Sequence, residues 1–376
     1  MLSVGLSARC RQSLLIESQT GKDVVMMQTN SQTVSSLRRE AKAKGLFLPV
    51  CDSAAALEST VELHGYTVAN RRSHQLPLTF DAKGGMPSAA TKARYTAAAK
   101  AGFGLLWSEP MAVCEEGKRH ADQLTLTEAT LPAIREMVQA MKQADGAQPS
   151  LLIAVLDHGG RYAVDPAPVE RCPVRDAALG YTAPLAEDMT LRRLIVTVGE
   201  AARLAEAAGF DGIALNAEMQ SLFGESLAAF SRDGVFGGDF EDRTRFLRDC
   251  YTAAKLTTEK AFLCIRLHLC DMIPQPHGWG MAFEDFDAPD MSEPALLLQI
   301  LHELYDVTLV ACEMAPAAHD DAVLAMSQGC TCTAMVDSAL QQQVHLVVPP
   351  CKELSHLAAN VGAAMVDEAF ASFAAL

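Results

Sequence analysis

Arg266 is the residue whose surroundings most clearly suggest a functional role, because it lies inside an apolar run, AFLCIRLHL (261–269). Such a run is typical of a strand that is buried on both faces. An arginine that is buried without a partner is costly, so Arg266 requires an anionic or strongly accepting partner. Two partners remain open at this point: a bound ligand and a neighbouring carboxylate.

Other patterns of catalysis and metal binding are missing from the sequence. His302, His319, His345 and His356 show no paired spacing and no HExxH motif, so no zinc site is expected. The chain has no GxSxG nucleophile elbow, no P-loop and no four-cysteine pattern for an iron–sulfur cluster. The eleven cysteines form no CxxC pair, which favours free thiols in a reducing cytoplasm over disulfides.

Charge and hydropathy narrow the classes of partner. The formal net charge of −15 would repel nucleic acid and anionic membrane surfaces. No apolar stretch is long and uncharged enough to predict a transmembrane helix, and the N-terminus lacks a clean signal-peptide core because Arg9 and Arg11 interrupt it. We therefore expect a cytoplasmic protein that acts on a small molecule, without a nucleic-acid or membrane partner.

Short apolar runs alternate with longer amphipathic stretches along the chain. The predicted strands are residues 71–80, 103–109, 150–158, 209–217, 261–269, 307–312, 330–336 and 344–350. Helical spacing is clearest at 128–143 and 191–209. Eight buried strands that alternate with helices predict an α/β fold of the (β/α)₈ TIM-barrel type. An open dinucleotide-binding sheet is disfavoured, because no GxGxxG follows the first strand.

The predicted organisation has two parts. Residues 1–60 look like an irregular N-terminal extension with one helical patch, SSLRREAKAKG. Residues 61–376 are predicted to form the barrel, with abbreviated connections in its last three β/α units. Cys330 and Cys332 lie two residues apart, a spacing that suits alternate positions on a strand.

Several motifs together resemble one family. They are VANRR (68–72), LPLTF (76–80), GGMPSAATKARYTAAAKAGFGLLWSEPMAV (84–113), LLIAVLDHGGRYA (151–163), FGGDFEDRTRFL (236–247) and IRLHLCDMIPQPHGWG (265–280). The set is similar to the Old Yellow Enzyme group of NADH:flavin oxidoreductases, and the resemblance runs from about residue 60 to 312. Each motif alone is weakly specific, and their combination is specific.

The resemblance implies a site at the C-terminal mouth of the barrel, where this family binds FMN. Arg266 matches the arginine that lies against the flavin and stabilises its reduced anion. Pro77, Leu78 and Thr79 match the first-strand segment in contact with the ring, with Thr79 donating to its O4 edge and Leu78 packing beneath it. Asn216 matches a residue that polarises the substrate carbonyl. NAD(P)H is the implied reductant.

The sequence departs from the family at several of the implied positions. Val155 replaces a glutamine that bonds to the flavin, and Met219 and Ser221 replace a His or Asn and the tyrosine that donates a proton. The family's glycine pair and Gly-Arg phosphate motif are missing, and the nearest match places Asp337 where a cation is expected. Pro349 and Pro350 also remove two backbone N–H donors.

Four further polar residues lie close to these motifs. His158 and Arg161 are interpreted as residues that shape the loop after the third strand rather than as cofactor contacts. Glu218 and Glu225 are acids that could replace the lost proton donor, but a solvated helix start is the role that we expect for both.

Two functions from different classes follow. The first is an FMN-dependent NAD(P)H oxidoreductase of ene-reductase type that reduces an unsaturated small molecule. The alternative is a flavin-free, degenerate barrel that acts as a binding or partner subunit, because the losses fall on cofactor and substrate positions. Relatives of this kind frequently associate, so a homo-oligomer is also an open expectation. The absorbance of bound flavin would distinguish the two functions.

Overall fold

A computed structural model of the chain describes residues 34–46, 48, 55–144, 149–284, 288–313, 322–341, 343–348 and 365–367. The strands are β1 (Val61–Leu63), β2 (Tyr66–Val68), β3 (Arg72–Gln75), β4 (Leu105–Trp107), β5 (Met111–Ala112), β6 (Leu151–Asp157), β7 (Gly212–Ala217), β8 (Phe262–His268), β9 (Leu309–Glu313), β10 (His345–Val348) and β11 (Met365–Asp367). The α-helices are α2 (Val34–Ala43), α3 (Ala89–Lys100), α4 (Leu131–Ala144), α5 (Pro173–Leu179), α6 (Asp188–Ala208), α7 (Leu222–Leu227), α8 (Phe240–Thr257), α9 (Ser292–Tyr305) and α10 (Ala322–Ala339).

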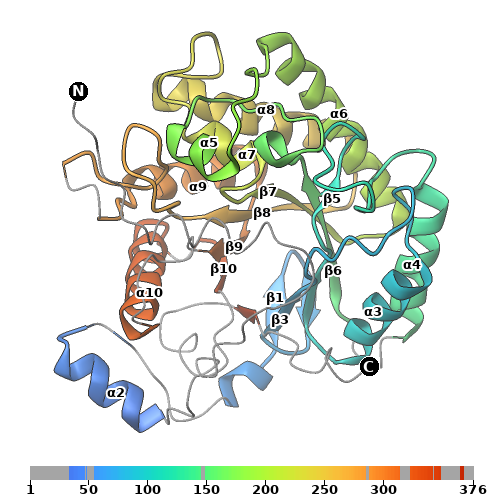
Figure 1. Cartoon of the computed structure of the whole chain (residues 1–376). Coiled ribbons are helices and arrows are strands. Elements are labelled where there is room, and N and C mark those ends of the chain that lie inside the picture. The colour runs from blue at the N-terminus through green and yellow to red at the C-terminus, as the bar shows by residue number, and fades with distance from the viewer. Residues whose placement is uncertain are drawn as a thin grey trace.

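Eight parallel strands close into a ring. Hydrogen-bonded neighbours follow the order β3, β4, β6, β7, β8, β9, β10 and β11. The ring closes where β11 pairs with β3, with Val366 opposite Arg72. Helices lie around the outside of the strands (Figure 1). The predicted (β/α)₈ TIM barrel is therefore confirmed.

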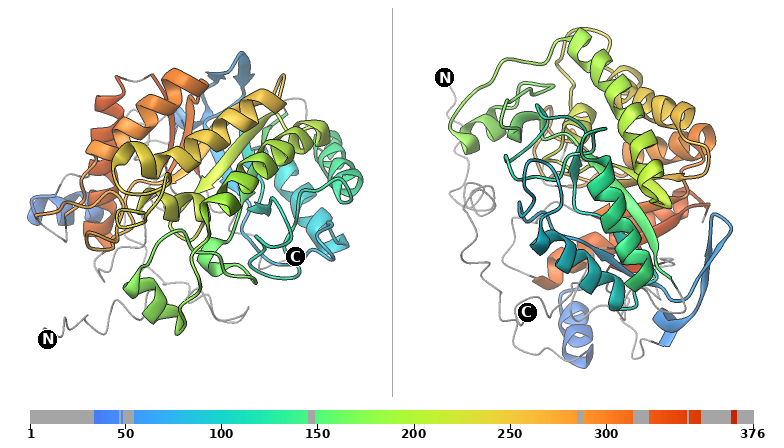
Figure 2. Two further views of the ribbon diagram at one scale, coloured as in Figure 1. Left: turned by 90° about the horizontal axis from the view of Figure 1, so that it is seen from above. Right: turned by 90° about the vertical axis from the view of Figure 1, so that its right-hand side faces the viewer.

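Helices α6 and α8 show how the outer layer is built. They run side by side, which Figure 2 shows from above. Gly199 of α6 allows the close approach, because a Cβ atom there would lie 3.1 Å from the Cβ of Ala253 in α8. Gly209, with φ of 102°, ends α6 in the left-handed conformation that glycine adopts most easily. None of the described helices is both long and apolar enough to span a membrane.

The barrel interior is apolar below its mouth. Leu105 and Trp107 of β4, Val155 of β6, Ala214 of β7 and Cys264 of β8 belong to one buried cluster inside the ring. Because side chains alternate across a strand, residues two positions further along β7 and β8 also face inward. Trp107 is completely buried, and its indole Nε1 donates a hydrogen bond to Ser73 Oγ on β3 at 3.0 Å.

Ser73→Ala should lower the free energy of unfolding by roughly 1–2 kcal/mol, because the buried indole N–H of Trp107 then loses its acceptor. Urea denaturation measures this change. The same substitution in a Trp107→Phe background should cost less, since phenylalanine has no N–H to leave unpaired. Equal costs in the two backgrounds would show that the bond contributes nothing.

One predicted strand is wrong. Residues 330–336 belong to helix α10, so Cys330 and Cys332 are helical, and the eighth strand of the ring is β11. Residues 322–339, AVLAMSQGCTCTAMVDSA, are mostly apolar or small, and periodicity alone cannot separate a helix from a strand in such a stretch. Asp337 therefore lies in a helix before the seventh strand of the ring and not directly after a strand, as the sequence predicted.

Candidate active site

The C-terminal mouth of the barrel carries a layer of polar side chains. Asn216 and Arg266 are register partners on the adjacent strands β7 and β8, two positions beyond the interior residues Ala214 and Cys264. Both side chains are buried, with exposures of 0% and 7%. The strands thus bring two of the predicted site residues together at one end of the ring.

Arg266 lies between two carboxylates. Its Nη2 contacts Glu218, which follows β7, and lies 3.4 Å from Oε1 of Glu313, the last residue of β9. Both strands that flank β8 therefore contribute an acid to this guanidinium. One of the two partners that the sequence left open, a neighbouring carboxylate, is therefore present.

Glu313 is the centre of a second set of contacts. Its Oε1 accepts a hydrogen bond from Gln75 Nε2 at 3.0 Å, and its Oε2 lies 3.5 Å from His268 Nε2. Burial opposes ionisation of this carboxyl, but the contacts with His268 and Arg266 prevail and lower the pKa of Glu313 to about 2. Glu313 is therefore an anion at neutral pH. The predicted strand 307–312 ended one residue before it.

His268 completes a group of possible metal ligands. Ligand atoms of Glu218, His268 and Glu313 lie within 4.8 Å of one another. The backbone N–H of Met219 donates to His268 Nδ1 at 3.2 Å, so in the neutral ring the proton sits on Nε2. A protonated Nε2 offers no lone pair to a cation, and Arg266 already contacts both carboxylates. The arrangement fits a network of ion pairs better than a metal centre.

A second ion pair lies beside Asn216. Arg119 forms a two-pronged contact with Asp157 at the end of β6, with Nε–Oδ2 and Nη2–Oδ1 distances of 2.9 and 3.0 Å. Asn216 Nδ2 also donates to Asp157 Oδ1 at 3.0 Å. Burial would raise the pKa of Asp157, but Arg119 outweighs it and holds the pKa below its usual value. The mouth thus contains two separate, charge-compensated clusters.

Two buried amide oxygens in this layer have no hydrogen-bond partner among the described residues. They are Asn216 Oδ1 and Gln75 Oε1. Each amide directs its nitrogen at a carboxylate, Asp157 or Glu313, and the reversed orientation would set oxygen against oxygen. A buried acceptor without a donor is costly, so each of these two oxygens could accept a hydrogen bond from a ligand or from water.

Comparison with known families identifies the chain. A model described as "NADH:flavin oxidoreductase / NADH oxidase family" matches residues 65–281, more than half of the 376 residues. The chain belongs to this family. Its sequence has no match among curated proteins.

Solved structures of similar fold agree with the family. A 2-naphthoyl-CoA reductase complex gives a TM-score of 0.70 at 15% identity, covering 84% of this chain and 50% of that one. The chain thus spans half the length of that reductase. An old yellow enzyme homologue from Zymomonas mobilis gives 0.64 at 19% identity, covering 83% and 88%. Morphinone reductase gives 0.62 at 18%, covering 83% and 85%. At these identities the likeness concerns the fold.

Not all of the flavin contacts that the sequence predicted for this chain lie with Asn216 and Arg266 in the barrel mouth; three of them lie at its edge, which we call the rim. Pro77, Leu78 and Thr79 lie in the irregular segment after β3, where Pro77 and Thr79 are exposed and Leu78 is partly buried. Although burial opposes it, hydrogen bonds from Arg94, Thr91 and Thr79 lower the pKa of Asp81. The Thr79 hydroxyl is thus already engaged on its own loop, and its contact with a flavin stays a prediction.

Two of the family positions that differ in sequence have structural roles here. Ser221 is the N-cap of α7, where its hydroxyl accepts from the Phe223 N–H at 3.4 Å. Val155 packs in the apolar interior below the mouth. This serine hydroxyl is engaged at the start of α7, and it is a much weaker acid than the phenol of the tyrosine that it replaces.

The loop after β6 confirms one interpretation and corrects another. Arg161 is buried, with contacts to Asp176, to the Glu170 carbonyl and, at 2.7 Å, to Glu225 Oε1. Arg161 shapes the loop, as predicted. Glu225, expected to be a solvated acid, is instead buried and also accepts the Val169 N–H at 3.0 Å. Burial of an acid is favoured here because arginine and backbone N–H groups satisfy it.

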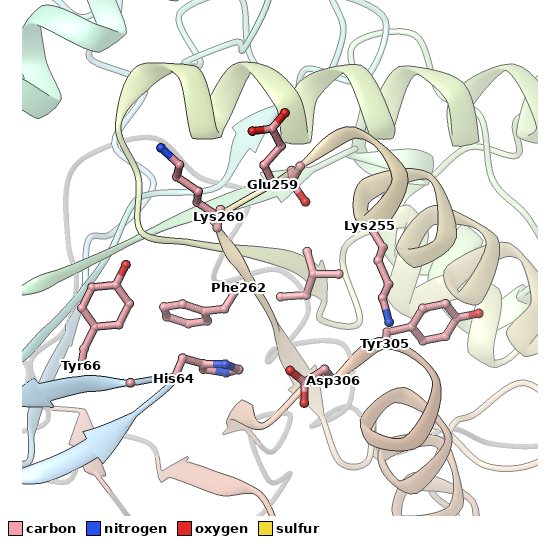
Figure 3. Close-up of a pocket in the computed structure, with 12 residues that line it drawn as sticks. His64, Tyr66, Lys255, Glu259, Lys260, Phe262, Tyr305 and Asp306 are labelled. Carbon is pink, nitrogen blue, oxygen red and sulfur yellow. The ribbon is translucent and has the colours of Figure 1, made fainter.

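A hollow of about 540 Å³ lies at the opposite end of the barrel (Figure 3). Its lining includes the hairpin residues His64 and Tyr66 and the start of β8 at Phe262. The rings of His64 and Phe262 stack with centroids 4.2 Å apart, and this pair closes the N-terminal end of the strands. In TIM barrels the active site lies at the C-terminal end, so we place the candidate site at the mouth rather than in this hollow.

Proposed function

We propose that the chain is a flavin oxidoreductase that binds FMN at the barrel mouth and uses NAD(P)H to reduce an unsaturated small molecule. The observation that carries the proposal is the convergence of a guanidinium, Arg266, with two unpartnered amide oxygens on one polar layer. A flavin's pyrimidine edge presents carbonyl oxygens and one N–H, so this donor and acceptor set fits it in kind. Membership of the family supports the same ligand.

The proposal assigns roles to residues of three strands. Arg266 would lie beside the electron-rich edge of the flavin, and the oxygen of either Gln75 or Asn216 would accept the one ring N–H. Pro77, Leu78 and Thr79 would contact the ring from the rim. When bound, FMN supplies hydride transfer between the nicotinamide and the acceptor. The segments after β10 and β11, which include Pro349 and Pro350, lie outside the described residues.

Asn216 has a second role in the proposal. One hydrogen of its Nδ2 is directed at Asp157, and the other is available to a substrate carbonyl. Asp157 and Arg119 hold the amide in place, because an amide that bonds to a fixed carboxylate cannot rotate freely. A positioned donor of this kind stabilises the negative charge that develops on a carbonyl during reduction.

The test is spectroscopic. The purified full-length protein, as isolated or after titration with FMN, should show absorbance bands near ~370 and ~450 nm, and NADH or NADPH should bleach them under anaerobic conditions. A protein that stays colourless throughout the titration contradicts the proposal. That outcome would favour a flavin-free binding or partner subunit.

Arg266→Gln should weaken FMN binding roughly 10- to 150-fold, the scale of a charge-assisted hydrogen bond of about 1.5–3 kcal/mol. Quenching of flavin fluorescence measures the dissociation constant, and circular dichroism checks that the variant folds. Arg203→Gln is the matched control, because Arg203 lies on α6 with 42% of its side chain exposed. An unchanged dissociation constant in Arg266→Gln would reject the role given to Arg266.

A further inference from the structure

Arg266 is not simply available to a ligand, because two acids compete for it. Glu218 follows β7 and Glu313 ends β9, so one acid approaches the guanidinium from each neighbouring strand. His268 also belongs to this cluster, and although burial opposes it, contact with Glu313 and the charge of Glu218 raise the pKa of its imidazole. An anionic ligand that reached the guanidinium would have to compete with both carboxylates for its N–H donors.

The two acids differ in how firmly they are held. Glu313 has other hydrogen-bond and charge partners, Gln75 at 3.0 Å and His268 at 3.5 Å, that keep it in place whether or not Arg266 moves. The prominent partner of Glu218 is Arg266. Burial raises the pKa of Glu218, against the opposing effect of Arg266, so its charge in the mouth is costly without that contact. Glu218 is therefore the carboxylate whose state depends most on Arg266.

We propose that Glu218 competes with the flavin for Arg266, so that the chain binds oxidised FMN better than the reduced, negatively charged form. The inference rests on the proposed function, because it needs a flavin in the mouth. An arginine beside a flavin normally favours the reduced anion. Here the carboxylate next to that arginine cancels part of its charge and repels the same anion. Glu218 is thus a residue that sets which redox state of the cofactor is held.

If Glu218 competes with the flavin for Arg266, removing the charge of Glu218 should tighten FMN binding. Glu218→Gln keeps the size of the side chain and removes its charge, so it should tighten the binding of oxidised FMN about fivefold and of reduced FMN about 50-fold. Titrations with FMN and with dithionite-reduced FMN under anaerobic conditions give both dissociation constants. The larger effect on the reduced form distinguishes a charge effect from a change of shape.

Three controls test whether the charge of Glu218 causes the effect. Glu218→Asp retains the charge and should bind FMN within about twofold of the unaltered protein. Glu241→Gln removes an exposed carboxylate from the first turn of α8 and should change neither constant. Riboflavin, which lacks the phosphate, should show the same preference in Glu218→Gln, because Glu218 acts on the ring and not on the phosphate.

The outcomes separate this inference from the proposed function. If the unaltered protein binds FMN and Glu218→Gln binds both redox forms no more tightly, the competition is disproved and the proposed function stands. If FMN binds to Glu218→Gln but not to the unaltered protein, the competition is supported and the proposed function fails. If neither protein binds FMN or riboflavin, both are wrong.

Discussion

Asp157→Ala is expected to lower the free energy of unfolding by about 3–5 kcal/mol, the usual cost of removing one partner of a buried ion pair. Asp157 is completely buried at the end of β6, and Arg119 reaches it with only 11% of its own side chain exposed. Alanine would leave the guanidinium without its two-pronged acceptor. Most of the expected loss of stability comes from leaving the buried Arg119 charge unpaired, rather than from losing its attraction to Asp157.

Urea denaturation at pH 7 measures the effect, with Asp157→Asn as the matched variant. Asparagine keeps the shape and one carbonyl oxygen, so it should cost less than alanine although it removes the charge. Lys83→Ala and Asp122→Ala, which break the same exposed ion pair, should change the free energy of unfolding far less than Asp157→Ala. A loss below about 1 kcal/mol for Asp157→Ala would mean that Arg119 finds water or another acceptor in the mouth.

The sequence predicted the scaffold of this site better than its contacts. Seven of the predicted runs coincide with barrel strands, and six of these strands are mostly apolar because a parallel strand is buried on both faces. The exception is β3, which reads RSHQ. The run at 330–336 did not coincide with a strand, since it lies in a helix with few polar residues to reveal the helical period. Local hydropathy thus located most strands, but it could not distinguish a helix from a strand in a mostly apolar segment.

The partners of Arg266 illustrate what the sequence could not supply. The apolar run around it predicted burial and the need for an acceptor, and both are confirmed. Glu218 and Glu313 are 48 and 47 residues away along the chain, so no local spacing links them to Arg266. A further signal did exist: each acid stands at or just beyond the end of a strand next to β8, where parallel strands present their last side chains to one another.

Acidification should destabilise the protein by up to about 3 kcal/mol between pH 6.5 and pH 4 through one residue, His158. The ring follows β6, is 3% exposed, and accepts the Gly160 N–H through Nδ1 at 3.0 Å. Burial lowers the pKa of His158 to about 4, although the Asp157 and Glu116 charges oppose it. Between these pH values the unfolded chain binds a proton that the folded chain does not, so stability falls as pH falls and levels off below 4.

The measurement is urea denaturation of the unaltered protein and of His158→Asn from pH 7.5 to 4.5. Asparagine can accept the Gly160 N–H without titrating, so the variant should lose the part of the slope that His158 contributes, even if its stability is lower throughout. Leu156→Ala, which creates a cavity at a buried position of the same strand, should lower stability and keep the slope. Glu313, whose lowered pKa acts only below pH 4.5, does not contribute in this window. An unchanged slope in His158→Asn would show that the ring is protonated in the folded protein or accessible to water.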